Sequence, residues 1–270
     1  MESNKSKVIL TMTCSKRLHL FKKVLPSFKN HCLDPEFIAK ILICDDSSSE
    51  EDRKEMEILA KELFPTTNIE FKYFNEIPTK YRHAHIMQHW YEYIAGFGYV
   101  FHLEDDRIMN SDFSLKEMID LLENDSQVAT VNIAQTKRDF PQEFLNEYNL
   151  DINYPKNEDY WVWPYVKTKE CGEALFYDSV RCEEGSKEYG INYFEYFINY
   201  AGFGLQPCLM HVDRIRSLET FELVDSLEAS FGKKYSEKYI TICYKQSKST
   251  HVGAVWFKET SAYDMNESLR

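Results

Sequence analysis

The sequence predicts an α/β fold in which a mostly parallel central sheet is flanked by helices. In the first half of the chain, short apolar, β-rich runs alternate with segments whose apolar residues recur at helical spacing. This alternation implies parallel βαβ units, and the nearly continuous apolar runs imply strands covered on both faces. Because no internal repeat, low-complexity tract or linker interrupts the chain, one continuous domain is expected.

Each element of the first half can be placed from its own pattern. Strands are expected at residues 7–13, 38–44, 68–74, 99–103 and 128–133. Helices are expected at residues 18–28, 49–64, 81–94 and 115–122. Ser49 followed by Asp52 is typical of a helix cap with acids in the first turn, which favours a helix start at this point.

The second half has a looser pattern. Residues 138–169 are rich in Pro, Asn, Asp, Tyr and Trp, and long structured loops are expected there. A strand is expected at residues 206–212, a helix at 221–234 and a strand at 239–244. The chain is therefore divided into residues 1–136 and residues 137–270, two halves that are packed as one domain.

Composition and charge disfavour several classes of partner. The formal net charge is −12, and an acidic chain repels phosphate backbones, so no nucleic-acid partner is expected. A nucleotide ligand is still compatible, because a bound divalent cation inverts the local charge. The polar start of the chain contains no secretory segment, and no run reaches the roughly 18 apolar residues of a membrane span. Seven cysteines without a CxxC pair indicate a reduced setting, so a cytoplasmic protein is expected. The sequence leaves the oligomeric state open.

Polar side chains gather where three of the predicted strands end. In an open parallel α/β sheet, ligands bind outside the carboxyl ends of the strands, so these side chains are candidates for a binding site. The first strand yields Thr11, Thr13 and then Arg17, the second yields Asp45 and Asp46, and the fourth yields Glu104, Asp105 and Asp106.

The acidic triplet repels itself unless a cation is close. Side chains alternate along a strand at about 3.3 Å per residue, so Glu104 and Asp106 face one side roughly 6.6 Å apart. Asp106 is a candidate ligand of Mg²⁺ or Mn²⁺, which leaves Glu104 or Asp105 for a water or a ribose hydroxyl. The alternative is a solvated turn whose carboxylates cap the next helix near Ser114.

The other two strand ends have alternatives of the same kind. Asp45 and Asp46 can accept hydrogen bonds from a base or a ribose, or they can form an Asx-turn that leads into the next helix. Arg17 can pair with a phosphate, or it can carry a solvated charge in the first helical turn. Each motif is therefore ambiguous when it is considered alone.

Taken in order, VILTMTCSKR, ILICDDSSSEED and YVFHLEDD resemble the nucleotide-binding half of GT-A fold glycosyltransferases, and most nearly the family 2 nucleotide-sugar transferases. The resemblance covers residues 7–135. It implies that Asp46 contacts the nucleobase and that Asp106, the last acid of a DxD-type motif, binds the metal. Glu104 stands where the family has Asp, which keeps the charge and changes only the reach. The start of the third helix resembles a donor-contacting segment, which implies a role for Arg82.

The second half is similar to the acceptor side of these enzymes. Residues 203–209 resemble a strand that lines the acceptor. The following helix falls where inverting members carry the catalytic carboxylate, which implies Glu228 as general base, with Asp225 and Glu222 as rivals. His251 resembles the histidine that closes the metal site in several GT-A enzymes, and neutral imidazole is an acceptable Mn²⁺ ligand.

The resemblance thus predicts a metal-dependent hexosyl- or pentosyltransferase. It would move a sugar from a nucleoside diphosphate sugar, most readily a UDP-sugar, to an acceptor hydroxyl on a glycan. Residues 1–136 would bind the donor and residues 137–270 the acceptor. An inverting displacement is expected, although a retaining one would need no base. Thr11, Thr13, Arg17, Asp45, Asp46, Arg82, Glu104 and Asp105 would hold the nucleotide sugar, Asp106 and His251 would hold Mn²⁺ or Mg²⁺, and Glu228 or Asp225 would be catalytic.

Two other functions are considered for the same residues. A sugar-phosphate nucleotidyltransferase would be expected to have a glycine-rich phosphate loop after the first strand, and TMTCSKR contains no glycine. A non-catalytic module of the same fold would bind a nucleotide sugar without turnover and would lose metal dependence. The intact acidic triplet disfavours this second alternative.

Two further patterns have structural explanations. His85 and His89 have the spacing of a zinc pair, but Ile86 stands where the HExxH motif has its Glu, so ordinary helix packing is expected. Trp161 and Trp163 could stack on an acceptor sugar or fill the core beneath their loop, and core packing is favoured.

Overall fold

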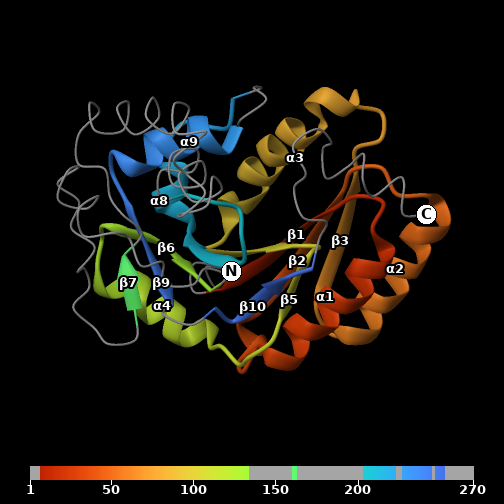
Figure 1. Cartoon of the computed structure of the whole chain (residues 1–270), viewed down its shortest axis with the longest axis horizontal. Coiled ribbons are helices and arrows are strands. Elements are labelled where there is room, and N and C mark those ends of the chain that lie inside the picture. Colours follow the sequence, from red (N-terminus) through yellow and green to blue (C-terminus); the bar gives the residue numbers. More distant parts are fainter. Residues whose placement is uncertain (1–6, 134–159, 163–202, 223–226, 245–246, 253–270) are drawn as a thin grey trace, which may run out of the picture.

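The computed structural model describes residues 7–133, 160–162, 203–222, 227–244 and 247–252. Within these residues, one eight-stranded sheet forms the centre of the molecule (Figure 1). Its strands are β1 (Val8–Cys14), β2 (Ile38–Asp45), β3 (Asn68–Tyr73), β4 (Tyr99–Glu104), β6 (Val128–Asn132), β7 (Tyr160–Val162), β8 (Cys208–His211) and β9 (Ile240–Tyr244).

The strand order is β3-β2-β1-β4-β8-β6-β9-β7. Strands β3, β2, β1 and β4 are parallel neighbours, and β6 is parallel to β9. Only β8 and β7 run against their neighbours in the described sheet. The prediction of a mostly parallel central sheet is therefore confirmed.

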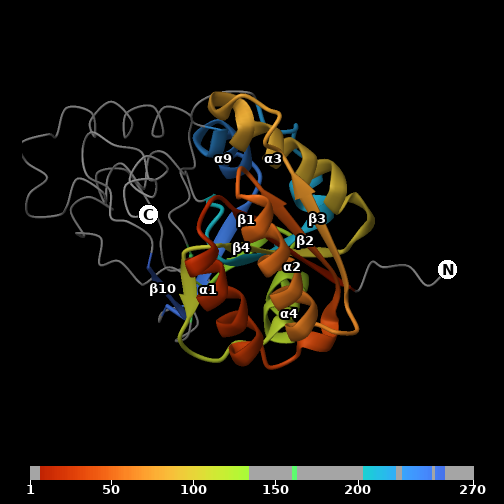
Figure 2. The same cartoon turned by 90° about the vertical axis from the view of Figure 1, so that its right-hand side faces the viewer.

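Helices cover both faces of this sheet (Figures 1 and 2). One face is packed by α1, α2 and α4, and the other by α3, α8 and α9. Two short 3-10 helices, η2 (Pro35–Phe37) and η3 (Ile94–Gly96), complete the described helical elements. The α-helices are α1 (Leu18–His31), α2 (Glu50–Leu63), α3 (Thr79–Tyr93), α4 (Leu115–Asn124), α8 (Val212–Arg216) and α9 (Leu227–Ser236).

The sequence of β1 explains the three layers. Val8, Leu10 and Met12 join the core on the α1 side, whereas Ile9 joins the core on the α3 side. Alternate side chains of a strand point to opposite faces, so a strand that is buried on both faces must be apolar throughout. This burial accounts for the continuous apolar run that predicted the strand.

The chain reverses its direction of winding between β1 and β4. The connections through α1 and α2 lead from β1 to β2 and then to β3, whereas α3 crosses to the other face and leads to β4, on the other side of β1. Such a switch point opens a crevice at the carboxyl ends of the strands. The register aligns Cys14 with Asp45 and Thr13 with Glu104, so these strand ends are level.

Most predicted elements of the described residues are present, with differences in the second half. The strand expected at residues 206–212 ends at His211, where α8 begins. Strand β7 lies in a segment that was expected to contain only loops, and the rest of residues 138–169 lies outside the described residues. A small sheet of β5 (Arg107–Met109) and β10 (Ser249–His251) was not predicted, because a three-residue strand has no readable period.

The lengths and hydropathies of the described helices bear on the membrane prediction. None of the helices in the described residues combines the length and apolar character needed to cross a membrane.

The eight-stranded sheet contains strands from both predicted halves of the chain.

Candidate functional site

The acidic triplet lies at the switch point. Glu104 is the last residue of β4, and Asp105 and Asp106 form the turn that leads into β5. The exposed fraction of the side chain is 32% for Glu104, 1% for Asp105 and 14% for Asp106. The three carboxylates therefore differ in their access to a ligand, and Asp105 has almost none.

Arg17 supplies a positive charge to this cluster. Its Nε donates to Asp105 Oδ2 at 3.0 Å, its Nη2 donates to Asp105 Oδ1, and its Nη1 donates to Asp106 Oδ2 at 2.9 Å. The backbone N–H of Ser15 also donates to Asp105 Oδ2 at 3.3 Å. Both oxygens of Asp105 are thus held by the protein, and the structure gives the cluster a cation from its own chain.

The small β5–β10 sheet brings His251 to Asp106. His251 is paired with Arg107, and the Val252 N–H donates to the Asp106 carbonyl at 2.8 Å. The His251 Nε2 atom lies 3.4 Å from Asp106 Oδ2. The predicted neighbours Asp106 and His251, which are separated by more than half of the chain, are therefore close in space.

One carboxylate oxygen of Asp106 has a different environment from the other. Oδ2 is shared by Arg17 and His251, whereas Oδ1 is buried and has no hydrogen-bond partner among the described residues. Buried polar atoms nearly always have a partner, so an unpaired one needs an explanation. Oδ1 is therefore the atom of the cluster best suited to accept an additional cation.

The cluster shifts the pKa values of its members. Burial and the charge of Asp106 raise the pKa of Glu104 to about 8, with Glu228 adding to this effect and Arg107 opposing it. Burial raises the pKa of Asp105 to about 7 despite the Arg17 guanidinium. Burial alone would raise the pKa of Asp106, but His251 and Arg17 outweigh it and lower this pKa below its ordinary value. Asp106 is thus the member of the triplet whose charged form is favoured by its surroundings.

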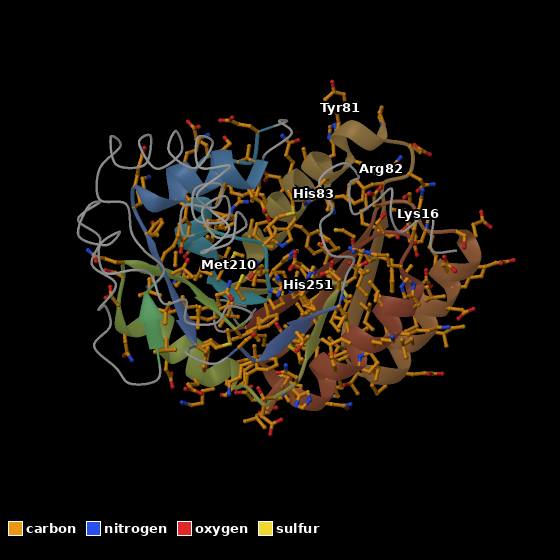
Figure 3. The ribbon with its side chains drawn as sticks, in the orientation of Figure 1. Lys16, Tyr81, Arg82, His83, Met210 and His251 are labelled. Carbon is orange, nitrogen blue, oxygen red and sulfur yellow. The ribbon has the colours of Figure 1, made fainter. Side chains whose placement is uncertain are left out.

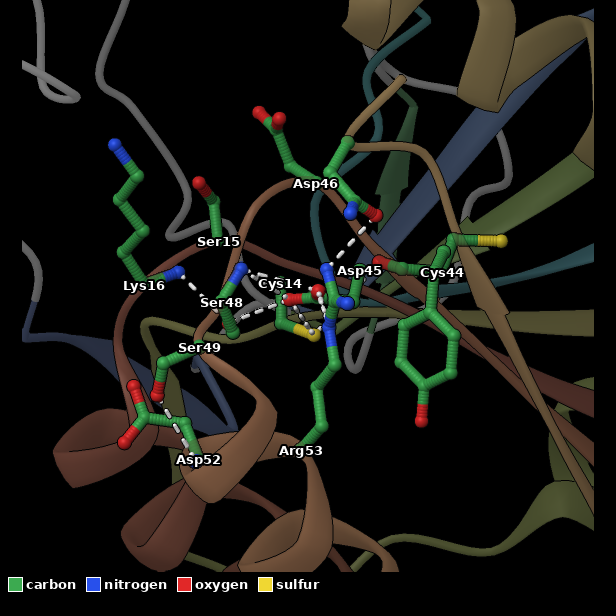
Figure 4. A network of polar contacts seen from close by, with 12 residues as sticks. Cys14, Ser15, Lys16, Cys44, Asp45, Asp46, Ser48, Ser49, Asp52 and Arg53 are labelled. Carbon is green, nitrogen blue, oxygen red and sulfur yellow. Dashed lines mark hydrogen bonds and ion pairs between the residues drawn. The ribbon is translucent and has the colours of Figure 1, made fainter. Parts of the chain in front are cut away.

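The end of β2 forms a second network, which Figure 4 shows from close by. Asp45 is fully buried and accepts hydrogen bonds from Ser48 Oγ at 2.5 Å, from the Ser48 N–H and from Arg53 Nε at 3.0 Å. These contacts form the turn before α2, whose N-cap is Ser49. Asp45 therefore forms a structural turn, as the alternative interpretation predicted. Its carboxylate is engaged by Ser48 and Arg53, so Asp45 is not a candidate contact for a ligand.

Asp46 is tied to the start of α3. Arg82 Nη1 donates to Asp46 Oδ1 at 2.6 Å, and Arg82 Nε donates to the Ile77 carbonyl at 2.8 Å. Figure 3 shows Arg82 and His83 on the first turns of this helix. Burial lowers the pKa of His83, against the opposing charge of Asp46. The structure thus brings the predicted residues Asp46 and Arg82 into direct contact.

Glu228 lies close enough to the cluster to interact with it electrostatically. Its Oε1 accepts a hydrogen bond from the Leu205 N–H at 3.2 Å, and its charge helps to raise the pKa of Glu104. Glu222, a rival for the base, is exposed and bound to Lys234 and Ser230. The other rival, Asp225, lies outside the described residues.

The two threonines of β1 have different environments. Thr11 is 1% exposed, and its hydroxyl lies 3.0 Å from His102 Nδ1 and accepts a hydrogen bond from Trp90 Nε1 at 2.9 Å. Because this hydroxyl is enclosed in the core, a donor contact by Thr11 is not retained. Thr13 is half-buried between Cys44 and Glu104 in the register, so it stays at the strand ends.

Some charged partners were not predicted. Arg53 binds Asp45, and Arg107 Nε lies 3.6 Å from Glu104 Oε2. Arg107 directly follows the triplet, so its position next to three acids was an available signal. Arg53 lies in the first turns of the helix predicted at residues 49–64, close after Asp45 in the sequence, so its position was an available signal as well.

The His85–His89 pair and the two tryptophans are the other predicted patterns. The His89 ring packs against Phe74 and Tyr93, as expected for helix packing. Trp161 lies in β7, but its side chain is not described, and Trp163 lies outside the described residues.

The donor set fits a hard divalent cation only in part. Among the described residues, no group of three His, Cys, Asp or Glu side chains is arranged to hold a metal ion. Mg²⁺ and related ions are often bound by one or two carboxylates, with waters and substrate phosphates as the other ligands. Asp106, whose Oδ1 has no partner among the described residues and whose Oδ2 lies 3.4 Å from His251 Nε2, is compatible with a site of that kind.

Comparisons with known proteins identify the fold. No family model and no curated protein sequence matches the chain. A mannosyltransferase from Pyrobaculum calidifontis, solved with GDP-Man and Mn²⁺, matches 92% of this chain at 12% identity and a TM-score of 0.56. TarS 1–349 from S. aureus matches 92% of this chain at 9% identity and a TM-score of 0.55. The complex of TarS 1–349 with UDP matches 90% of this chain at 11% identity and a TM-score of 0.53.

These matches extend over nearly all of this chain but not of the others. The chain spans 57% of the mannosyltransferase, and it spans 60% of TarS 1–349 and 59% of the same protein in its UDP complex. At such low identity the likeness concerns the fold alone. The three-layer arrangement and the mostly parallel sheet agree with that likeness. The chain therefore has the GT-A-type fold of these glycosyltransferases.

Proposed function

We propose that the chain is a metal-dependent glycosyltransferase that transfers a sugar from a nucleoside diphosphate sugar, preferably a UDP-sugar, to a hydroxyl of a glycan. One observation carries the proposal. In a GT-A-type fold, Asp106 lies at the switch point with a buried, unpartnered carboxylate oxygen and with His251 beside it. GDP-Man with Mn²⁺ and UDP are bound in structures of similar fold, which supports a donor of this class.

The donor would lie across the ends of β1, β2 and β4. Thr13, Asp46 and Arg82 are the retained candidates for contacts with the nucleotide, because they lie at these strand ends or bind a residue there. Glu104 is partly exposed and is retained as a contact with the sugar or ribose. Asp105 is not retained, since Arg17 and Ser15 hold both of its oxygens.

Asp106 and His251 are the residues that would hold Mn²⁺ or Mg²⁺. When bound, the metal would stabilise the negative charge that develops on the departing diphosphate. The lowered pKa of Asp106 keeps its carboxylate ionised at neutral pH, which a hard cation requires. Asp106 therefore supplies a charged ligand without the cost of losing a proton.

Glu228 is the proposed general base. It would take the proton from the acceptor hydroxyl as that oxygen forms a bond to the anomeric carbon. The bond from the anomeric carbon to the diphosphate breaks on the opposite side, and the nucleoside diphosphate leaves with the electron pair. An inverting outcome follows from this single displacement. The interaction of Glu228 with Glu104 supports its position beside the reacting centre.

A screen of nucleotide sugars tests the donor site. The melting temperature, donor hydrolysis and sugar transfer of the wild type are measured with each nucleotide sugar, with and without Mn²⁺, and Asp106→Asn serves as the control. Pyrophosphate release from nucleoside triphosphates and sugar phosphates is measured in parallel. We expect Mn²⁺-dependent stabilisation and turnover with one donor, and loss of the metal effect in the variant. Stabilisation without hydrolysis or transfer would favour a non-catalytic module. Pyrophosphate-releasing synthesis of a nucleotide sugar would favour a nucleotidyltransferase, and no response to any nucleotide would reject the site.

A comparison of Glu228 with Glu222 tests the base. Glu228→Gln should lower transfer by about 100-fold to 10,000-fold, the usual contribution of a general base, and leave donor binding unchanged. Glu222→Gln is the matched control, because Glu222 is exposed and bound to Lys234. Equal transfer by Glu228→Gln and the wild type would remove Glu228 from the mechanism.

A further inference from the structure

Arg17 joins two adjacent carboxylates that have different surroundings. Its Nε and Nη2 bind Asp105, which is 1% exposed, and its Nη1 binds Asp106 Oδ2 at 2.9 Å. A guanidinium has a rigid fork of donors, so contacts in several directions fix its orientation. Asp105 therefore anchors Arg17, and the remaining arm of Arg17 reaches Asp106.

The backbone before α1 also holds Arg17 in place. Lys16 has a φ of 50°, which is unfavourable for a residue with a side chain, and its N–H donates to Ser48 Oγ at 3.0 Å. The Arg17 carbonyl accepts from Leu20 and Phe21 in the first turn of α1. A strained conformation persists only where its surroundings determine it. The position of Arg17 is thus fixed by the turn, by the helix and by Asp105.

The contact with Arg17 determines which oxygen of Asp106 is available. Oδ2 is engaged by Arg17 and lies 3.4 Å from His251, whereas Oδ1 is buried without a partner among the described residues. The two oxygens of a carboxylate are equivalent, so Arg17 fixes the plane of the group: with one oxygen bound to Arg17 Nη1, the other is held in a defined direction, whereas without Arg17 the group could rotate about its Cβ–Cγ bond. Arg17 therefore selects one orientation of the carboxylate.

We propose that Arg17 is a positioning residue for the divalent cation, which holds Asp106 so that Oδ1 faces the metal. This inference rests on the metal site of the proposed function. Arg17 has two opposite effects on such a site. Its charge repels a cation, which weakens binding, and its hydrogen bond orients the ligand, which strengthens binding. On this inference orientation outweighs repulsion, because loss of a group that orients a metal ligand typically costs about 10-fold to 100-fold in metal affinity.

The direction in which substitution of Arg17 changes the affinity for Mn²⁺ distinguishes orientation of the ligand from repulsion of the cation. The affinity for Mn²⁺ is measured by electron paramagnetic resonance of free Mn²⁺, with the whole chain, first alone and then with UDP. Arg17→Ala should weaken Mn²⁺ binding by about 10-fold to 100-fold, the usual effect of losing a group that orients a metal ligand. Arg17→Lys keeps the charge but has no fork, so its affinity should lie between those of Arg17→Ala and the wild type.

Arg107→Ala is the matched control. It removes a positive charge that lies 3.6 Å from Glu104 and that also lowers the pKa of Asp106, but the described contacts include no hydrogen bond from Arg107 to Asp106. Loss of charge alone should leave Mn²⁺ binding equal to the wild type or tighter. Circular dichroism and the melting temperature in the absence of metal verify that each variant is folded. If Arg17→Ala does not fold, the Mn²⁺ affinities of Arg17→Lys and Arg107→Ala are compared instead.

The outcomes separate this inference from the proposed function. Equal or tighter Mn²⁺ binding by folded Arg17→Ala, or by Arg17→Lys where Arg17→Ala does not fold, would overturn the positioning role and leave the metal site intact. Equal weakening in the Arg17 and Arg107 variants would also overturn it, because the effect would then not depend on the contact with Asp106. If the wild type binds no Mn²⁺ either alone or with UDP, the metal site of the proposed function fails and the positioning role fails with it.

Discussion

Each acidic side chain at the strand ends has an arginine within reach, and each arginine comes from a different part of the chain. Such pairing lowers the energy of carboxylates that burial would otherwise make costly. It also means that removal of one arginine leaves a buried charge without its partner, which costs more than the pair contributes. The pairs are Asp45 with Arg53, Asp46 with Arg82, Asp105 and Asp106 with Arg17, and Glu104 with Arg107.

The pH dependence of stability tests the environment of Glu104. Its pKa is raised to about 8 in the folded chain from an ordinary value of 4.5, so the folded state binds more protons than the unfolded state between these values. The free energy of unfolding contributed by Glu104 is therefore highest below pH 4.5 and falls as the pH rises toward 8. Urea unfolding of the wild type and of Glu104→Gln from pH 5 to 8 measures this contribution as a difference.

The sign of that difference is the decisive result. We expect the wild type to lose stability relative to Glu104→Gln as the pH rises. The raised pKa of Asp105, about 7, also lowers the free energy of unfolding as the pH rises, and it does so in both proteins. The stability of the variant therefore still falls with pH, but less steeply than that of the wild type. Parallel curves would show that Glu104 has an ordinary pKa, and the acidic cluster would then not be as strongly coupled as its burial indicates.

At the scale of elements, the β5–β10 sheet connects the second half of the chain to Asp106, the proposed metal ligand. The Val252 N–H donates to the Asp106 carbonyl at 2.8 Å, and His251 precedes it. Val252→Pro removes this donor, whereas Val252→Ala keeps it. We expect Val252→Pro to weaken Mn²⁺ binding about as much as His251→Ala, with no change in Val252→Ala. Calorimetric titration with Mn²⁺ measures the affinities, and wild-type binding by the proline variant would show that His251 does not depend on this sheet.

A second prediction at this scale concerns the start of α4. Asp34 accepts hydrogen bonds from the Leu115 N–H at 2.7 Å, the Lys116 N–H at 2.8 Å and the Ser114 hydroxyl at 2.7 Å. These backbone donors have no partner inside the helix. Asp34→Ala should lower the free energy of unfolding by about 2 kcal/mol, the upper part of the range for a helix cap.

The control for this prediction is another helix cap. Ser49 accepts one backbone hydrogen bond at the start of α2, from the Asp52 N–H at 3.1 Å. Ser49→Ala should therefore cost about 1 kcal/mol, less than Asp34→Ala. Chemical denaturation of both variants gives the comparison. A smaller loss for Asp34→Ala than for Ser49→Ala would contradict the role of Asp34 as a remote cap for α4.

The elements differ in how far the sequence predicts them. Helix α2 has a clear helical period and an N-cap, and strand β1 is a continuous apolar run. Both were therefore predicted within a few residues. Strands β5 and β10 have three residues each, and their pairing joins Arg107 to His251, so no local pattern reveals it. The same limit applies to Arg17, whose partners depend on which strands become neighbours.

At the scale of the whole molecule, the sheet order places the site. Strands β1 and β4 are separated in the sequence by two other strands, and their pairing aligns Thr13 with Glu104. A sequence with alternating strands and helices predicts parallel pairing but leaves the order open. The placement of Asp46 and Asp106 at strand ends was therefore expected from the sequence, whereas their partners Arg82 and Arg17 required the topology.

The continuous sheet predicts that the two halves unfold together. Strand β8 lies between β4 and β6, and its Leu209 is fully buried and paired with Phe101 and Val131. Leu209→Ala should lower the free energy of unfolding by about 2 to 5 kcal/mol, since it removes buried methyl groups and leaves a cavity. Urea unfolding followed by far-UV circular dichroism and by tryptophan fluorescence should give one coincident transition in the wild type and in the variant. Two separate transitions, or a shift seen by only one probe, would mean that residues 1–136 and 137–270 unfold as separate units. A single shifted transition would instead place the strands of residues 137–270 in the same cooperative unit as the strand ends that carry Asp46 and Asp106.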